Sequence, residues 1–200
     1  MRTTASSVLR ARAGCGVAGM AHSYMVAFLL LCGVPVHAGL PDTVDKIRPS
    51  IVAVGTVKPA KRANAAGPAL NYLGTGFVVS KDGLIATNLH VIGTARRIQV
   101  HLSDGTVHDV TAIHARDSAL DLAVIRIAKQ DLKPLPLADS DKVKQGQTVL
   151  AIGHPQGLEF SVVEGVISAV REIEGASMIQ VAIPIEQGNS GGPLLDMQGR

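Results

Sequence analysis

Cysteine is scarce in this chain of 200 residues, which contains only Cys15 and Cys32. Both lie within the first 38 residues, so the rest of the chain cannot form a disulfide bond of its own. Burial of hydrophobic side chains therefore has to stabilise the folded part. The remaining ~160 residues are enough for one domain, or for two small domains that share a cleft.

A long apolar run is also missing. Residues 24–34 are apolar, but a membrane-spanning helix needs roughly 20 such residues. Three arginines precede this run, and the small residues of Val-His-Ala at 36–38 follow it. We therefore predict that residues 1–38 are a signal peptide, which leaves no stable membrane span after cleavage. The alternatives are an uncleaved anchor and a lipid anchor, and Leu31 before Cys32 disfavours the second.

An excess of charge of one sign is missing once this leader is removed. Three of the 19 basic residues but none of the 16 acidic residues lie in residues 1–38, so the predicted mature chain carries 16 of each. Its net charge is therefore zero. This balance gives no indication of a nucleic-acid partner or of an anionic membrane surface.

Short runs rich in β-branched residues, separated by Gly, Asp and Pro, recur along the mature chain. This pattern is typical of an all-β protein, and helical periodicity is almost absent. The predicted strands of the first half are 51–58, 75–79, 84–87, 97–102, 107–115 and 122–127. Asp-Gly at 104–105 and Lys-Asp-Gly at 81–83 are turn signals between strands. The segment 59–73, rich in Ala, Pro and Gly, is predicted to be an exposed loop.

The two prolines of Lys-Pro-Leu-Pro at 133–136 interrupt the strand pattern. Further strands are predicted at 148–152, 161–171 and 178–183. Two sets of strands joined by such a linker predict two antiparallel β-barrels, of residues 39–132 and 133–200. The second set is too short to close, so we expect an incomplete second barrel and a chain that is a fragment of a longer gene product.

A serine surrounded by glycines gives the sharpest chemical signal. Residues 188–193 read Gly-Asn-Ser-Gly-Gly-Pro, and the glycines permit a tight turn around Ser190. Such a turn can direct the amide groups of Gly188 and Ser190 toward one point, an oxyanion hole for a tetrahedral intermediate. An ordinary glycine-rich loop would give the same pattern, so the motif alone leaves both interpretations open.

A histidine and an aspartate supply the partners that such a serine needs. His90 follows the predicted strand 84–87, and Asp121 begins the apolar strand 122–127. A carboxylate at the start of a buried strand is costly unless a partner pairs with it. An imidazole is such a partner, because Asp121 can stabilise the cation that forms when His90 takes a proton from Ser190.

The chain order His90, Asp121, Ser190 in these local contexts resembles the trypsin-like serine proteases. Thr-Asn-Leu-His-Val at 87–91 and Asp-Leu-Ala at 121–123 are similar to the HtrA/Deg branch of that family. Two further segments resemble the same family, Gly-Thr-Gly-Phe-Val-Val at 74–79 and Gly-His-Pro-Gln-Gly at 153–157.

The resemblance extends over residues 51–196 and implies two packed barrels with the three residues in the cleft between them. It implies that Ser190 attacks a peptide carbonyl, His90 moves the proton and Asp121 orients the imidazole. No metal ion or cofactor is implied. Asn189 stands where secreted digestive relatives have an aspartate that pairs with a new amino terminus, so we expect no activating cleavage.

The segment before the serine departs from the family pattern. Val181 and Ala182 stand where a Thr-Asp pair is common, and Gln187 stands where proline is common. We predict that Ile185, Glu186 and Gln187 contribute to substrate binding. The substrate residue before the cleaved peptide bond is expected to have a small aliphatic side chain. Glu186 is expected to be exposed, which disfavours a selection of basic substrates.

The other polar candidates receive structural interpretations. The spacings of His101, His108 and His114 match no usual zinc site, so we expect these side chains to face solvent. His154 lies in a turn that could be near the cleft. Asp117 precedes the buried strand and is expected to cap a turn rather than to serve as the catalytic acid.

Two functions from different classes follow. The first is an exported serine endopeptidase that hydrolyses unfolded or misfolded proteins in the periplasm or another extracytoplasmic compartment, as the resemblance implies. The second is a non-catalytic protein-binding module, or an inactive fragment, that keeps the protease fold. The presence of His90, Asp121 and Ser190 together favours the first. The second is plausible for these 200 residues because the strands that follow the serine in the resembled fold, and form one wall of the substrate pocket, are missing. The PDZ domain, a peptide-binding module usual at the C-terminus of HtrA/Deg proteins, is missing as well. The resemblance also suggests a homotrimer, although residues 39–49 lack an aromatic anchor.

Overall fold

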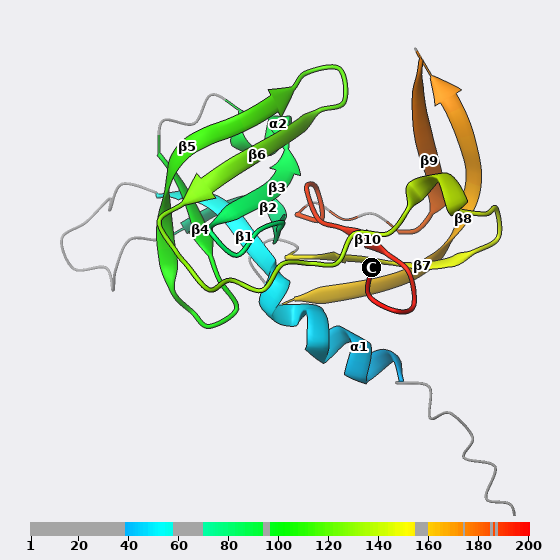
Figure 1. Cartoon of the computed structure of the whole chain (residues 1–200), viewed down its shortest axis with the longest axis horizontal. Helices are drawn as coiled ribbons and strands as arrows, with labels where there is room; N and C mark the ends of the chain where they lie inside the picture. Colours follow the sequence, from blue (N-terminus) through cyan, green and yellow to red (C-terminus); the bar gives the residue numbers. More distant parts are fainter. Residues whose placement is uncertain are drawn as a thin grey trace, which may run out of the picture. The chain divides into compact units, whose positions relative to one another are not determined.

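The structure is a computed structural model that describes residues 39–57, 70–93, 97–154, 160–173, 175–184, 186 and 188–200. Within these residues the chain forms two antiparallel sheets (Figure 1). The first is a closed barrel with the strand order β1 (Ile51–Val57), β2 (Leu70–Val78), β3 (Leu84–Asn88), β6 (Leu122–Ile127), β5 (Val107–Asp117) and β4 (Ile98–His101). The second is an open sheet with the order β10 (Leu194–Leu195), β7 (Thr148–Gly153), β8 (Ser161–Ile173) and β9 (Ala176–Ala182). The predicted all-β fold with an incomplete second barrel is confirmed.

The predicted strands correspond to β1 through β9, and β6 has the predicted bounds. The predicted loop at 59–73 is wrong at its end, because β2 already begins at Leu70 and pairs with β1 through Tyr72 and Gly55. The rest of that loop and the predicted signal peptide lie outside the described residues. The domain boundaries inferred from the sequence stay a prediction.

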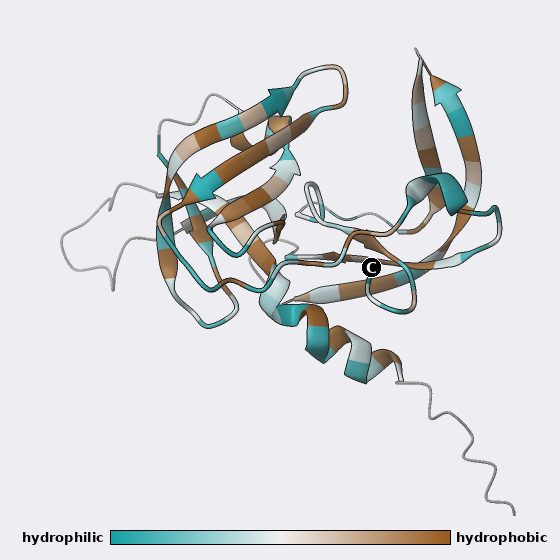
Figure 2. Ribbon diagram, in the orientation of Figure 1, coloured by the Kyte–Doolittle hydropathy of each residue, from teal (hydrophilic) through white to brown (hydrophobic). Residues whose placement is uncertain are grey.

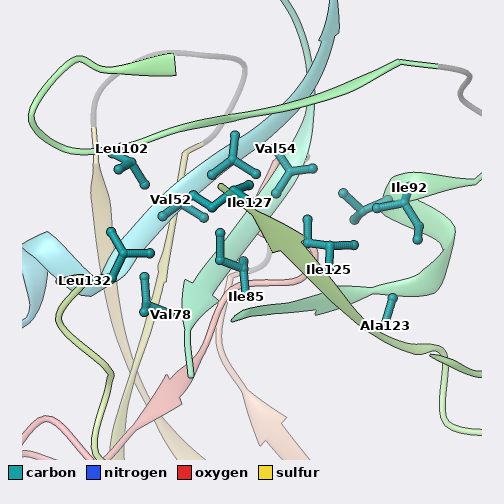
Figure 3. Packing of buried hydrophobic residues seen from close by; sticks show 12 residues of the cluster. Val52, Val54, Val78, Ile85, Ile92, Leu102, Ala123, Ile125, Ile127 and Leu132 are labelled. Carbon is teal, nitrogen blue, oxygen red and sulfur yellow. The ribbon is translucent and has the colours of Figure 1, made fainter. Parts of the chain in front are cut away.

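Alternation along the strands builds the barrel interior, as the stripes of hydrophobic and hydrophilic residues in Figure 2 indicate. Val52 and Val54 of β1 point inward and meet aliphatic side chains from the other strands (Figure 3). These side chains are almost inaccessible to water, and burial of each contributes about 1.5–3 kcal/mol. The core holds the cluster Val52, Val54, Val78, Ile85, Val91, Ile92, Val100, Leu102, Ala123, Ile125, Ile127 and Leu132.

The opposite face of β1 belongs to a second hydrophobic cluster. Ile51 is fully buried there, against Leu150 and Ile152 of β7 and Leu195 of β10. Because side chains alternate along a strand, β1 contributes Val52 and Val54 to the barrel core and Ile51 to the second cluster. This strand therefore connects the barrel to the second sheet.

A helix that the sequence pattern did not predict precedes β1. This helix, α1 (Leu40–Ile47), begins with Pro41 in its first turn, and the Asp42 side chain accepts a hydrogen bond from the Gly39 amide at 3.2 Å. Ile47 packs into the second cluster, and α1 is followed by the 3₁₀ helix η1 (Arg48–Ser50).

Two other short helices occur in the described residues, α2 (Leu89–Ile92) and the 3₁₀ helix η2 (Ser140–Lys142). None of the helices in this part of the chain has the length and apolar character that a membrane crossing requires.

Candidate active site

His90 and Asp121 lie in direct contact where β3 ends and β6 begins. These strands pair so that Asn88 stands opposite Leu122, which sets the start of α2 beside the residue that precedes β6. The His90 Nδ1 atom lies 2.5 Å from the Asp121 Oδ2 atom, and the His90 backbone amide donates to Oδ1 at 2.8 Å. One carboxylate thus holds both the ring and the main chain of the histidine.

Asp121 has an unusual backbone conformation. Its φ of 51° lies in the left-handed region, which costs an L residue about 1–2 kcal/mol. Its carbonyl oxygen accepts hydrogen bonds from the Leu89 amide and from the Asn88 side chain, each at 2.9 Å. Together with the bonds to its carboxylate, these contacts hold the residue in this conformation.

The carboxyl group of Asp121 is ionised at neutral pH. Burial raises its pKa, but the hydrogen bonds from the His90 ring and amide, and the charge of His90, lower the pKa more, so that it lies below the usual 3.8. The side chain is 43% exposed, and that of His90 is 59% exposed. An ionised carboxylate at this position can stabilise a histidine cation.

Ser190 lies in a glycine-rich turn between β9 and β10. Gly188 and Gly191 adopt φ of 109° and 82°, a region that side chains disfavour. A Cβ at Gly191 would lie 2.2 Å from both the Thr75 carbonyl oxygen and the Thr87 Oγ1 atom. The turn therefore needs glycine at this position for steric reasons as well.

Hydrogen bonds within the turn orient its peptide groups. The Asn189 amide donates to the Glu186 carbonyl at 3.2 Å, and the Gly192 amide donates to the Asn189 carbonyl at 2.9 Å. In a trans peptide, the amide of the next residue points away from that carbonyl. The Ser190 amide is thus directed opposite to the Asn189 carbonyl oxygen.

Two residues of the barrel hold this turn. The Thr75 amide donates to the Ser190 carbonyl at 2.8 Å, and the Thr75 hydroxyl donates to the Gly188 carbonyl at 2.6 Å. The Gly191 amide donates to the Asn88 Oδ1 atom at 2.7 Å. The peptide group between residues 190 and 191 is therefore held at both its oxygen and its nitrogen.

The backbone of Ser190 comes close to the helix that carries His90. A Cβ at Gly74 would lie 2.6 Å from the Ser190 carbonyl oxygen and 2.8 Å from the Val91 Cγ2 atom. Within the described residues, no hydrogen bond joins the Ser190 hydroxyl to His90. The structure thus pairs His90 with Asp121 and brings the main chain of Ser190 close to α2. The Ser190 hydroxyl and the His90 ring are not hydrogen-bonded.

The structure describes only one of the three predicted substrate-binding residues. Glu186 is exposed, as expected, while Ile185 and Gln187 lie outside the described residues. A pocket of about 510 Å³ lies elsewhere, on the second sheet beside β7 and the segment that follows residue 135. Its lining includes Gly192 and Pro193 but not His90, Asp121 or Ser190.

Thr75 and Asn88 are site residues to which the sequence assigned no role. Both occur in the segments that carry the family resemblance, but the sequence pattern indicates only a strand at Thr75 and only a motif position at Asn88. A polar residue inside an otherwise apolar strand is the signal that could have identified Thr75, which is fully buried.

The histidines outside the pair differ in their surroundings. The expectation of a solvent-facing His101 is wrong, because this residue is half-buried and its Nε2 atom has no hydrogen-bond partner among the described residues. His114 is exposed, and the His108 Nε2 atom contacts the Thr106 hydroxyl at 3.0 Å. The His154 Nδ1 atom is buried without a partner in the described part of the chain.

Asp117 behaves as expected and caps a turn, since its Oδ1 atom accepts hydrogen bonds from the amides of Ala119 and Leu120. Across the described ranges, no group of three or more His, Cys, Asp or Glu side chains is arranged to hold a metal ion.

Comparison with known proteins identifies the family. Residues 74–200 match the family described as trypsin-like peptidase domain. The chain is 42% identical over 131 residues to the probable periplasmic serine endoprotease DegP-like of Halomonas elongata. This alignment covers 64% of this chain and 27% of that protein. It is 34% identical over 169 residues to serine protease HTRA2, mitochondrial, of Bos taurus, and this alignment covers 80% of this chain and 36% of that protein. The chain belongs to the HtrA/Deg branch of the trypsin-like peptidases.

Solved structures support this HtrA/Deg membership. The HtrA-type protease AlgW with decapeptide superimposes with a TM-score of 0.70 at 29% identity, covering 80% of this chain and 56% of that one. The serine endoprotease from Yersinia pestis gives a TM-score of 0.67 at 33% identity, covering 82% of this chain and 56% of that one. This HtrA/Deg chain spans about a quarter to a third of the two curated relatives, 27% and 36% of their lengths.

Proposed function

We propose that the chain is a serine endopeptidase that cleaves polypeptides by acyl transfer, with Ser190 as nucleophile, His90 as base and Asp121 as the residue that orients His90. The contact between His90 and Asp121 carries this proposal. With Nδ1 engaged by the carboxylate, Nε2 is the ring nitrogen that can accept the serine proton. The second hydrogen bond, from the His90 amide, restricts rotation of the pair.

In the proposed mechanism, His90 removes the Ser190 proton as the hydroxyl oxygen attacks the substrate carbonyl. The amides of Gly188 and Ser190 stabilise the oxyanion of the tetrahedral intermediate. His90 then donates its proton to the leaving amine, and water releases the acyl group by the reverse sequence. The hydrogen bond from the Gly192 amide to the Asn189 carbonyl supports this role, because it restricts the peptide group that carries the Ser190 amide.

A protein-binding module without hydrolysis is the second candidate. The observation that favours it is the missing hydrogen bond between the Ser190 hydroxyl and His90. Catalytic hydrogen bonds are often long in a substrate-free enzyme and tighten when substrate binds, so this geometry is also compatible with catalysis.

We propose unfolded or misfolded polypeptides as substrates and an extracytoplasmic location, with residues 1–38 as an export signal. A DegP-like relative that is named periplasmic supports this location, although a mitochondrial relative also exists. Assembly into a homotrimer stays a prediction from the family resemblance. The contribution of Ile185, Glu186 and Gln187 to substrate binding stays a prediction.

The test is covalent labelling of the purified chain with a fluorophosphonate, which reacts with an activated serine. A Ser190→Ala variant is the matched control, and hydrolysis of unfolded casein is followed in parallel. We expect the parent to be labelled and to degrade casein, and the variant to do neither. A parent that binds casein but is labelled no more than the variant would establish the second candidate instead.

A further inference from the structure

Thr75 is a buried polar residue that makes two hydrogen bonds to the turn around Ser190. It lies on β2 opposite Ala53 of β1, and Ala53 is also opposite His101 of β4. The neighbours of Ala53 on β1, Val52 and Val54, face the barrel interior, so Ala53 and the residues paired with it face outward. The side chain of Thr75 therefore leaves the barrel on the side of the second sheet.

The hydroxyl group of Thr75 makes two hydrogen bonds. It donates its only proton to the Gly188 carbonyl at 2.6 Å and accepts a hydrogen bond from the His154 amide at 2.9 Å. Because the amide can only donate, the direction of both bonds is determined. One oxygen atom thus joins β2, the residue that follows β7, and the turn that contains Ser190.

The main chain of Thr75 adds two further bonds. Its amide donates to the Ser190 carbonyl at 2.8 Å, and its carbonyl accepts from the Thr87 hydroxyl at 2.7 Å. Thr75 therefore holds the turn at two carbonyl groups, those of Gly188 and Ser190. The Thr87 contact in turn fixes Thr75 to β3, the strand that leads to His90.

Gly188 requires such a contact because it has no side chain to restrict it. Its φ of 109° lies in a region that glycine alone samples freely. Rotation about the backbone bonds of Gly188 would change the direction of its carbonyl relative to its own amide. The proposed oxyanion donors are the amides of Gly188 and Ser190, on either side of the bond from Thr75. An oxyanion hole stabilises the transition state only when its donors are already oriented.

We propose that Thr75 is a positioning residue, whose hydroxyl group holds the Gly188 carbonyl and thereby orients the amides that stabilise the oxyanion. This inference rests on the proposed serine endopeptidase function. It predicts an effect on the chemical step rather than on substrate binding, because the hydroxyl group contacts the turn and not the substrate. The effect should follow the hydroxyl and not the volume of the side chain.

Three substitutions separate these two properties. Thr75→Val keeps the shape and loses the hydroxyl, Thr75→Ser keeps the hydroxyl and loses the methyl group, and Thr75→Ala loses both. Each purified variant is compared with the parent in fluorophosphonate labelling rate and in kcat and KM for a fluorogenic peptide. Rates are normalised to the folded fraction from thermal unfolding, so that a loss of stability is not counted as a loss of catalysis.

We expect Thr75→Val and Thr75→Ala to lower kcat on the order of 10- to 100-fold with KM nearly unchanged, less than the loss of a direct oxyanion donor. Thr75→Ser should retain most of the activity. Hydrogen exchange of the peptide that spans residues 186–194 should become faster in the Val and Ala variants but not in the Ser variant. If Thr75→Val folds poorly, the pair Thr75→Ala and Thr75→Ser gives the same comparison.

Two results would overturn the role of Thr75 while leaving the proposed function intact. One is a labelled parent whose Val and Ala variants react as fast as Thr75→Ser. The other is a Ser variant that loses as much kcat as the Val variant, because packing would then be the cause. A parent that is labelled no more than Ser190→Ala overturns the proposed function itself, and with it the positioning role of Thr75.

Discussion

The side chain of Asn88 donates a hydrogen bond to the carbonyl oxygen of Asp121 at 2.9 Å. Its Oδ1 atom accepts a bond from the Gly191 amide at 2.7 Å, so one partly buried amide group connects the proposed acid to the turn of the proposed nucleophile. Asn88→Asp keeps the shape but loses the donor to Asp121. We expect this variant to lower the free energy of unfolding by about 1–2 kcal/mol and to slow the labelling of Ser190.

Urea denaturation and the fluorophosphonate reaction rate measure both effects for Asn88→Asp. Gln198→Glu makes the same chemical change at an exposed residue and should alter neither quantity. Equal unfolding midpoints and equal labelling rates for Asn88→Asp and the parent would show that this bridge has no energetic role.

Asp121→Asn is predicted to reduce turnover on the order of 10⁴-fold, because the amide favours the wrong tautomer of His90. The measurement is kcat for a peptide substrate at neutral pH. Asp117→Asn is the control, since Asp117 caps a turn four positions earlier through an oxygen atom that asparagine retains, and its turnover should stay close to that of the parent. Similar turnover of the two variants would rule out Asp121 as the residue that orients His90.

His154 is predicted to make stability dependent on pH. Burial lowers its pKa below the usual 6.5, and the charges of Arg48 and His101 lower it further. Between the folded pKa and 6.5 the unfolded chain therefore binds more protons than the folded chain. The contribution is complete above about pH 6.5 and is lost as the pH falls through the folded pKa.

The free energy of unfolding, measured by urea titration at about pH 7.5 and about pH 5, should thus decrease toward the lower pH. His154→Gln should show a smaller decrease, whereas His114→Gln, at an exposed residue, should match the parent. If His154→Gln is as sensitive to pH as the parent, the titration of other groups accounts for the dependence.

Gly191→Ala and Gly105→Ala form a matched pair, because the two glycines have nearly equal φ of 82° and 81°. At Gly105 a Cβ meets open space, so only the backbone cost of about 1 kcal/mol is expected. At Gly191 the Cβ would lie 2.2 Å from two oxygen atoms, and we expect a loss on the order of 3 kcal/mol or more. Thermal unfolding of both variants provides the comparison, and equal losses would contradict the close packing at Gly191.

Ile51→Ala tests the second hydrophobic cluster. Ile51 is fully buried between β1 and β7, and its truncation should cost about 2–5 kcal/mol. Leu137→Ala removes an aliphatic side chain that is 74% exposed and should change stability by less than about 0.5 kcal/mol. Denaturant unfolding with similar midpoints for these two variants would mean that the cluster is not packed as described.

The strands could be predicted from the sequence because their residue patterns are local. β6, for instance, is a mostly aliphatic run with predicted bounds at Leu122 and Ile127 that the structure retains. The helix α1 was missed because it spans only 8 residues, too few for a clear period, and gains its stability from packing of Ile47 against the second sheet.

The candidate site also has a part that could be predicted from the sequence and a part that could not. The pairing of His90 with Asp121 could be expected from the motifs that carry the family resemblance. The desolvation argument was not needed, because the Asp121 side chain is 43% exposed in the structure. The contacts of Thr75 with Gly188 and of Asn88 with Gly191 join residues separated by 113 and 103 positions. No local pattern encodes such distances, since they depend on how the barrel meets the second sheet.

The alternation along β1 has a further consequence for mutation. Val52 and Val54 face one core and Ile51 faces the other, so a single-residue insertion near the start of this strand would exchange the two rows. Both interiors would receive the wrong side chains at once, and Ala53 would leave its position opposite Thr75. Substitutions that preserve side-chain volume should be tolerated along β1, whereas insertions and deletions should abolish folding.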